Sequence, residues 1–117
     1  MENKKAETAI RALDSKKGID IELMKVADLT VLTEYFVLAT GTSNTHIRSL
    51  ADEVEFKMRE AGFEPLRIEG RATGWILQDY GDVIVHVFSA EQRAQYALEK
   101  LWGDAERVDI SEIVTEN

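Results

Sequence analysis

The segment from Trp75 to Phe88, WILQDYGDVIVHVF, constrains the fold more than any other, because it is the densest hydrophobic and aromatic stretch of the chain. Two short strand-like runs meet at Tyr80-Gly81-Asp82, a pattern that predicts a β-hairpin. The second run, from Val83 to Phe88, has apolar residues at both odd and even positions, which indicates a strand covered on both faces. The hairpin therefore predicts a sheet with an inner strand that is buried on both sides.

The first run of the hairpin mixes apolar and polar side chains on each face, because neighbouring residues of a strand point to opposite sides. One face carries Trp75, Leu77 and Asp79, and the other carries Ile76, Gln78 and Tyr80. A tryptophan beside hydrogen-bond acceptors suits contact with a protein partner, since it supplies a large area with a polar handle. The alternative is a half-buried strand whose tryptophan closes the edge of the core, and these residues alone favour that alternative.

The length of 117 residues, with 44% hydrophobic and 31% charged residues, is typical of one globular domain. We assign the domain to residues 1–110 and expect residues 111–117 to form a loose tail. The absence of cysteine excludes a disulfide framework and thiolate metal sites. The charged N-terminus lacks the apolar run of a signal peptide, and no segment has membrane-spanning length, so we expect a soluble, cytoplasmic protein.

The charge balance points to a class of partner. The chain has 22 acidic and 14 basic residues, a net charge of -8 and a pI near 4.7. Binding to a nucleic-acid backbone requires clustered lysine and arginine, so direct nucleic-acid binding is disfavoured. A basic protein surface is the better electrostatic partner. The alternative, that the charge only keeps a small domain soluble, is equally compatible with the composition.

Hydrophobic periodicity and capping residues predict the other elements. Residues 35–40, YFVLAT, indicate a central strand buried on both sides. Helices that alternate with strands, together with one hairpin, imply an α/β fold with a mixed sheet and packed helices. The expected helices run from Lys4 to Lys17, from a Ser43 or Asn44 cap to Gly62, and from Ser89 to Gly103, and the other expected strands are residues 19–24, 66–69 and 107–110.

Three of these elements have a predicted buried side. In the strand at residues 19–24, apolar and polar residues alternate, which indicates one dry face. In the second helix, Phe56 lies nearly opposite the apolar stripe, so we expect it on the surface. In the last helix, Arg93 and Tyr96 lie off the predicted inward stripe. That stripe consists of Ala90, Ala94, Ala97, Leu98 and Leu101.

Asp20 and Glu22 place two carboxylates on one side of a strand. A nucleotidyltransferase uses this spacing to hold magnesium against a triphosphate, with a Gly-Ser turn that precedes the carboxylate strand. Here Gly41-Thr42-Ser43 follows that strand, and no basic cluster lies nearby. We therefore interpret the two carboxylates as a solvated strand face. A nucleotide-binding or nucleotidyl-transferring enzyme that uses Asp20 and Glu22 is the alternative function.

The two histidines, His46 and His86, lie on different predicted elements, and no spacing of carboxylates proposes further ligands for a metal site. His86 stands among valines in the second arm of the hairpin, which favours a hydrogen-bonded, partly buried structural histidine. No serine lies in a Gly-x-Ser-x-Gly turn. The sequence therefore predicts no catalytic residue, no metal ligand and no cofactor.

Two long motifs carry a resemblance to a known family. The first is residues 33–43, TEYFVLATGTS, and the second is the hairpin at residues 75–88, which reads W-x-L-x-D-Y-G-D-x-x-x-H-x-F. On these motifs the chain resembles the ribosomal silencing factor family, also called the Iojap family. Further matching pieces are Asp20-Ile21, Glu69-Gly70 and the segment from Arg93 to Trp102, which ends in LEKLW.

The resemblance implies a fold like that of nucleotidyltransferases without the catalytic constellation, and a regulator of translation rather than an enzyme. It implies binding to the large ribosomal subunit through its fourteenth protein, at the surface that the small subunit occupies. Binding there blocks subunit joining and represses translation, notably when nutrients are scarce. The resemblance also implies a homodimer. Gln78 and Glu34 depart from the leucine and aspartate that are common at these positions.

The residues and the resemblance meet at the hairpin, where we place the partner-binding site. Trp75 and Leu77 form the predicted apolar anchor, and two aspartates of the hairpin offer carboxylates to a basic partner. A dimeric adaptor that uses the exposed Phe56 is a further alternative. The predicted partner-binding residues are Trp75, Leu77, Asp79, Tyr80, Asp82, Arg93 and Tyr96.

Overall fold

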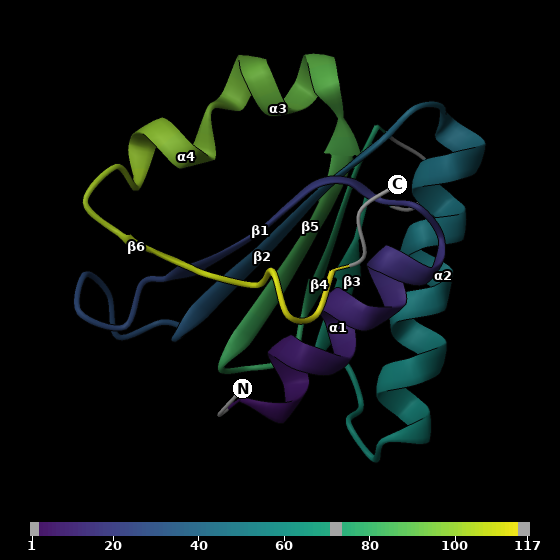
Figure 1. The fold of residues 1–117 in the computed structure, drawn as a ribbon, viewed down its shortest axis with the longest axis horizontal. Coiled ribbons are helices and arrows are strands. Elements are labelled where there is room, and N and C mark those ends of the chain that lie inside the picture. The colour runs from purple at the N-terminus through teal and green to yellow at the C-terminus, as the bar shows by residue number, and fades with distance from the viewer. Residues whose placement is uncertain (1–2, 71–73, 115–117) are drawn as a thin grey trace.

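A mixed six-stranded sheet with helices on both faces forms the structure (Figure 1), a computed structural model that describes residues 3–70 and 74–114. Its strands are β1 (Ile19–Lys25), β2 (Tyr35–Gly41), β3 (Arg67–Glu69), β4 (Trp75–Asp79), β5 (Val83–Ser89) and β6 (Glu106–Val108), and its helices are α1 (Lys4–Ser15), α2 (Asn44–Glu60), α3 (Ala90–Tyr96) and α4 (Leu98–Leu101). The strands lie in the order β3-β4-β5-β2-β1-β6. β2 and β5 pair in parallel, and the other neighbours pair antiparallel. The predicted α/β fold and hairpin are therefore confirmed.

Helices α1 and α2 both begin at a side-chain cap. The Asn3 side chain accepts a hydrogen bond from the Ala6 amide at 3.0 Å, and Ser43 accepts one from the His46 amide at 3.1 Å. These bonds satisfy amides that the start of a helix leaves without a partner. Of the two caps that the sequence left open, Ser43 is the one used. The buried stripe of α2 is Ile47, Leu50, Ala51, Val54 and Met58, as its periodicity predicts.

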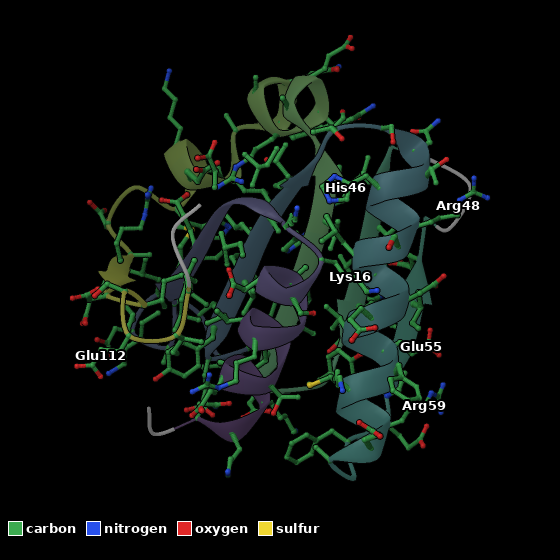
Figure 2. The ribbon with its side chains drawn as sticks, turned by 45° about the vertical axis from the view of Figure 1, so that its right-hand side comes forward. Lys16, His46, Arg48, Glu55, Arg59 and Glu112 are labelled. Atoms are coloured by element: carbon green, nitrogen blue, oxygen red, sulfur yellow. The ribbon has the colours of Figure 1, made fainter. Side chains whose placement is uncertain are left out.

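The face of the sheet against which α1 and α2 pack is here called the covered face (Figure 1). The outward side of α2 carries charged residues such as Glu55 and Arg59, which form an ion pair at 2.9 Å (Figure 2). The central strand and the inner hairpin strand that the sequence predicts both contribute fully buried side chains to this face. These side chains are Val37, Ala39, Val83, Val85 and Val87.

The opposite face of the sheet is covered over only part of its width. Helices α3 and α4 cross one end of it (Figure 1), and a smaller core lies beneath them, formed by Met24, Val26, Phe36, Leu38, Phe88 and Ala105. The side chains that this face presents over β3, β4 and the adjoining part of β5 are exposed or half-buried. We call this region the open face, and its residues are Arg67, Glu69, Trp75, Leu77, Asp79 and Ile84.

Strand β1 does not have the one dry face that its alternation predicts. Ile19 is exposed, whereas Leu23 and Met24 are both buried, because the cores on the two sides of the sheet both reach the second half of β1. Asp20 has a φ of 49°, and the pairing of β1 with β2 shifts register between Ile19 and Glu22. This irregularity breaks the simple alternation of the strand.

The C-terminal segment forms the predicted short strand, β6, which pairs antiparallel with β1. Of the expected loose tail at residues 111–117, the structure describes residues 111–114, and in that part Ile113 and Val114 pack against the larger core. Residues 115–117 lie outside the described part of the chain, as do residues 71–73 of the connector that the sequence predicts between Gly70 and Gly74.

The predicted last helix is two helices, because Ala97 adopts a left-handed conformation, with φ 46° and ψ 51°, between α3 and α4. The predicted inward stripe is wrong for three of its five residues, because Ala90 and Ala94 are exposed and Leu101 is 73% exposed. Leu98 does pack against the smaller core, as predicted. Arg93 is instead the buried residue of α3. Alanine buries little apolar area, so the polar contacts of Arg93 decide which side of α3 faces the sheet. Within the described ranges, no helix has the length and apolar character needed to cross a membrane.

Candidate protein-binding surface

The register of the sheet brings one set of side chains onto the open face. Residues directly opposite each other in an antiparallel pair point to the same side of the sheet. Across β3 and β4, Glu69 pairs with Leu77 and Arg67 pairs with Asp79. Across β4 and β5, Asp79 pairs with Ile84. The open face is therefore an apolar centre bordered by charged residues of both signs.

Trp75 lies at the end of the open face nearest to α3. The centroid of its ring lies 4.7 Å from that of Tyr96 and 5.6 Å from that of Phe88. Trp75 thus closes the edge of the smaller core and also borders solvent, so each of the two sequence interpretations describes part of its position. A shallow hollow of about 390 Å³ opens beside these rings, lined by Glu69, Gly70, Trp75, Leu77, Gln92 and Tyr96.

His86 fixes the orientation of Trp75. The indole Nε1–H donates to His86 Nδ1 at 3.1 Å, so the neutral imidazole carries its proton on Nε2. His86 is 5% exposed, and burial lowers its pKa to about 4. The prediction of a hydrogen-bonded structural histidine is confirmed, and the residue is buried rather than partly buried. Because the indole N–H is used inside the protein, the ring itself is what Trp75 presents to the hollow.

The two aspartates of the predicted site lie toward the turn of the hairpin, and both have partners within the chain. Asp79 lies 3.3 Å from the guanidinium of Arg67 on the open face. Asp82 accepts hydrogen bonds from Lys5 at 2.8 Å and from Asn3 at 3.0 Å. Burial raises the pKa of Asp82, but these bonds outweigh burial and hold the pKa below its usual range. Asp82 therefore ties the start of α1 to the hairpin turn.

Tyr80 lies on the covered face and adds no exposed area to the surface. It is 3% exposed, and its hydroxyl donates to Gln78 Oε1 at 2.6 Å. Gln78 donates in turn to the carbonyl oxygen of Ala51 in α2 at 2.8 Å. Burial raises the pKa of Tyr80 well above its ordinary value. The glutamine that stands in place of the expected leucine thus completes a buried network with Tyr80.

Arg93 is 8% exposed, so the predicted position of this residue on the outer side of the helix is wrong. Its Nη1 donates to the Asp20 carbonyl oxygen and to Thr40 Oγ1, both at 2.9 Å. Its Nη2 lies 2.8 Å from Glu22 Oε2, and its Nε lies 3.0 Å from Glu99 Oε1. All three guanidinium nitrogens are therefore hydrogen-bonded, as a buried charge requires. Burial alone lowers the pKa of Arg93, but the two carboxylates raise it above its ordinary value.

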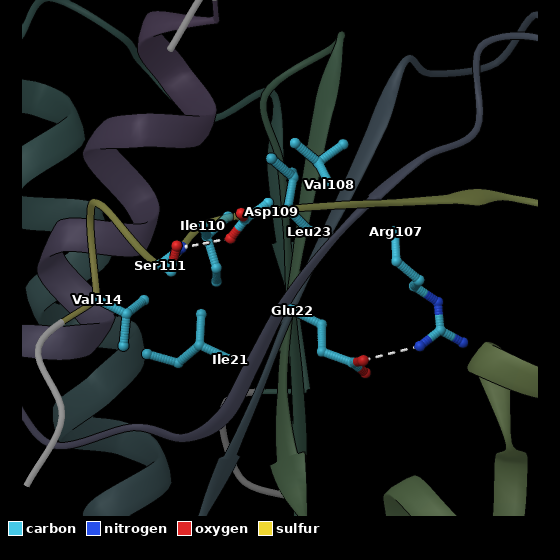
Figure 3. Close-up of a pocket in the computed structure, with 9 residues that line it drawn as sticks. All are labelled: Ile21, Glu22, Leu23, Arg107, Val108, Asp109, Ile110, Ser111 and Val114. Carbon is cyan, nitrogen blue, oxygen red and sulfur yellow. Dashed lines mark hydrogen bonds and ion pairs between the residues drawn. The ribbon is translucent and has the colours of Figure 1, made fainter.

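Glu22 is not the solvated carboxylate that the strand pattern predicts, because it bridges Arg93 and Arg107. The Arg107 Nη1 lies 2.7 Å from Glu22 Oε1 (Figure 3). Burial and the adjacent Glu99 carboxylate raise the pKa of Glu22, whereas the hydrogen bonds from Arg93 lower the pKa of Glu99 to about 2. A magnesium ion would have to displace both arginines from Glu22. Within residues 3–70 and 74–114, no three histidine, aspartate or glutamate side chains gather as a metal site.

His46 lies away from the open face and joins two loops. Its Nδ1 accepts a hydrogen bond from the Thr42 amide at 2.9 Å, and its Nε2 donates to the Lys16 carbonyl oxygen at 2.9 Å. The residue therefore links the end of α1 to the start of α2 (Figure 2). The two histidines serve separate structural roles.

Four side chains of the surface are absent from the sequence interpretation. Arg67 lies opposite Asp79 in β3. Ile84 lies opposite Asp79 in the hairpin, a position that follows from the turn at residues 80–82 once the register is counted. Glu69 and Gln92 reach the hollow from β3 and α3. No local sequence pattern predicts these two residues, because their approach to the hollow depends on how β3, β4 and α3 pack together.

The whole chain, residues 1–117, matches a family described as "Ribosomal silencing factor during starvation". The chain belongs to this family. Ribosomal silencing factor RsfS of Halalkalibacterium halodurans is 35% identical to it over 108 residues, which cover 92% of each chain. A mouse relative, "Mitochondrial assembly of ribosomal large subunit protein 1", is 31% identical over 97 residues, which cover 80% of this chain and 42% of the mouse protein. The family resemblance drawn from the sequence motifs is confirmed.

The silencing-factor fold is also found in a solved structure. A crystal structure of a protein from Chromobacterium violaceum has a TM-score of 0.84 to this chain at 37% identity, and the match covers 95% of this chain and 93% of that chain. The predicted α/β fold with a mixed sheet is therefore shared with a solved structure over nearly the whole chain. The two relatives above are named for regulation and assembly of ribosomes rather than for a catalysed reaction.

Proposed function

We propose that this chain is a ribosomal silencing factor that binds the large ribosomal subunit and represses translation. Membership of the family supports this proposal, as does the name of the mouse relative, which refers to assembly of the ribosomal large subunit. The proposed partner is the fourteenth protein of the large subunit, at the surface that the small subunit occupies. The bound domain blocks subunit joining in the cytoplasm, where ribosomes translate.

The open face is the proposed contact surface. The observation that carries this assignment is a half-buried apolar row, formed by Trp75, Leu77 and Ile84, on a sheet whose other side packs against α1 and α2. Such a row can bury further apolar area against a partner. Glu69 and Asp79 border the row, and the net charge of -8 favours a basic ribosomal protein over bare RNA.

The proposed mechanism is occupancy rather than chemistry, so inhibition follows saturation of the large subunit. Trp75 is the proposed main anchor of the contact, because contacts with His86 and Tyr96 already hold its ring in place. A side chain that is ordered before binding loses less entropy on binding. We expect Trp75→Ala to remove about 2 to 4 kcal/mol of binding free energy.

Co-sedimentation with separated large and small ribosomal subunits tests this function. We expect the protein to pellet with large subunits only, and Trp75→Ala, checked for native folding by circular dichroism, to weaken retention by more than about tenfold. Leu101→Ala is the matched control, because Leu101 is 73% exposed on α4 and lies outside the open face. Equal retention of the native protein and a folded Trp75→Ala variant contradicts the assigned surface. Absence of binding to either subunit contradicts the function itself.

Self-association is a second proposed property, and it concerns a different surface. Phe56 is 56% exposed on the outer side of α2 and is the proposed contact between two copies. Analytical ultracentrifugation is expected to show a native mass near twice 13.2 kDa and a monomeric Phe56→Glu variant. A native protein that sediments as a monomer at micromolar concentration contradicts this property.

A further inference from the structure

We propose that Arg93 is a positioning residue of the binding surface: by anchoring α3 to the sheet, it holds Tyr96 against Trp75. This inference rests on the proposed function, because it concerns how the surface around Trp75 is formed before a partner arrives. Arg93 has too little exposure, 8%, to supply contact area of its own. Its effect on binding therefore passes through the side chains that it places.

Helix α3 depends on Arg93 for its position. The helix has seven residues, and a helix of this length is not stable in water without tertiary contacts. Arg93 is its buried residue, and the Arg93 guanidinium reaches β1, β2 and α4 through its hydrogen bonds. The guanidinium also lies 5.5 Å from the centre of the Phe88 ring in β5. At the other end of the helix, Ser89 caps the Gln92 amide at 3.0 Å.

Tyr96 follows Arg93 by three residues, so the two side chains lie close to the same side of α3. Tyr96 is 52% exposed, and the centroid of its ring lies 4.7 Å from that of Trp75. A ring that is half exposed is held weakly by its own burial, so the place of Tyr96 follows the place of the helix. The pair of rings forms one wall of the hollow. Loss of the Arg93 hydrogen bonds is therefore expected to move Tyr96 and to leave the Trp75 ring less ordered.

Arg107 offers a matched control, because it pairs with the same carboxylate as Arg93 but belongs to β6. Its Nη1 lies 2.7 Å from Glu22, and its Nη2 lies 3.4 Å from the Glu99 carbonyl oxygen in α4. The Arg107 side chain is 45% exposed, and exposed ion pairs contribute little to stability. Removing Arg107 therefore changes the charge of the cluster while leaving the anchor of α3 in place.

The first test uses the isolated protein and needs no ribosome. The indole N–H signal of Trp75 in a nitrogen-15 NMR spectrum, assigned with Trp75→Phe, responds to the neighbouring Tyr96 ring. We expect Arg93→Gln to move this signal toward its position in Tyr96→Ala. Arg93→Lys should move it less, since lysine keeps the charge but not the planar fork. Arg107→Gln should leave it unchanged.

A folded Arg93→Gln protein with a native Trp75 signal overturns the positioning role. If that variant does not fold, Arg93→Lys and Glu99→Gln decide the question in the same way, because each weakens the hydrogen bonds of residue 93 while keeping its buried positive charge. A native Trp75 signal in both of these variants overturns the proposal, and a shift toward the Tyr96→Ala position in both supports it.

The second test measures affinity for large ribosomal subunits in a double-mutant cycle. Arg93→Gln and Tyr96→Ala should each weaken binding by about five- to tenfold, and the double variant should bind no more weakly than the weaker single variant, because Arg93 acts through Tyr96. Losses that multiply in the double variant overturn the proposal. Unchanged binding by Trp75→Ala overturns the assigned surface instead, and absence of binding by the native protein overturns the proposed function. In both cases the NMR signals still decide the positioning role.

Discussion

The two faces of the sheet use their side chains for different purposes. On the covered face, the strand valines are fully buried beneath α1 and α2, and the polar groups of Gln78 and Tyr80 satisfy each other inside that core. On the open face, charged side chains border an apolar centre, and a histidine holds the largest side chain, Trp75, in place. One face therefore stabilises the fold, while the other keeps an ordered surface available.

The largest expected difference between the faces concerns two leucines. Leu50 is fully buried against the covered face, and Leu77 is half-buried on the open face. We expect Leu50→Ala to lower the free energy of unfolding by about 3 kcal/mol, because it leaves a cavity, and Leu77→Ala to lower it by less than about 1 kcal/mol. Urea denaturation measures both values. Equal losses of unfolding free energy in the two variants would show that the open face belongs to a hydrophobic core rather than to a binding surface.

The next effect comes from His86, whose pKa is lowered by burial from its ordinary value of 6.5 to about 4. The folded protein therefore binds this proton more weakly than the unfolded chain, so the stabilising contribution is complete above about pH 6.5 and is lost as the pH falls toward 4. Between pH 7 and pH 5 we expect the free energy of unfolding to fall by about 2 kcal/mol. His86→Gln should remove most of this slope. A native protein with equal stability at pH 7 and pH 5 contradicts the expectation.

The buried network on the covered face gives a smaller effect. Gln78→Leu leaves the Tyr80 hydroxyl without the acceptor it has at 2.6 Å, and we expect a loss of about 1 to 2 kcal/mol in thermal or chemical unfolding. Adding Tyr80→Phe removes the stranded hydroxyl, so the double variant should recover most of that loss. A double variant as unstable as Gln78→Leu alone would show that packing, not hydrogen bonding, sets the cost.

The smallest effect separates the two aspartates of the hairpin. Asp82 is engaged with Lys5 and Asn3, so Asp82→Asn should change affinity for large ribosomal subunits by less than about twofold, in line with a partly exposed ion pair. Asp79 lies on the open face, and Asp79→Asn should weaken binding more than Asp82→Asn does. The reverse order, measured by co-sedimentation, would move the contact surface to the hairpin turn.

Much of the fold was predictable because its signals are local. The apolar runs of β2 and β5, the stripe of α2 and the turn at residues 80–82 each follow from neighbouring residues. The alternation of β4 also separated Trp75 and Leu77 from Tyr80 correctly. The predicted site nevertheless included Tyr80, which this alternation places on the other face. In the structure Tyr80 is buried there and is only 3% exposed.

The side of α3 that faces the sheet could not be predicted from the sequence of the helix. Hydrophobic periodicity treats Ala90 and Ala94 as apolar and Arg93 as polar. It therefore predicts that Arg93 faces solvent. The three bonds that bury Arg93 against β1 and β2 reach residues 53, 71 and 73 positions away in the sequence. Such partners become visible only when the strands are placed side by side, and the same is true of Glu69 and Gln92 at the hollow.

The strand order has a consequence for the synthesis of the protein itself. β2 lies in the middle of the sheet between β1 and β5, but residues 83–89 are made long after residues 35–41. Until β5 is complete, one edge of the apolar strand YFVLATG has no native neighbour, and an unpaired strand edge is prone to aggregate. A chain that ends before Val83 therefore cannot close its central sheet. We expect such fragments to be insoluble rather than partly active, so activity arrives only with nearly the full length of the chain.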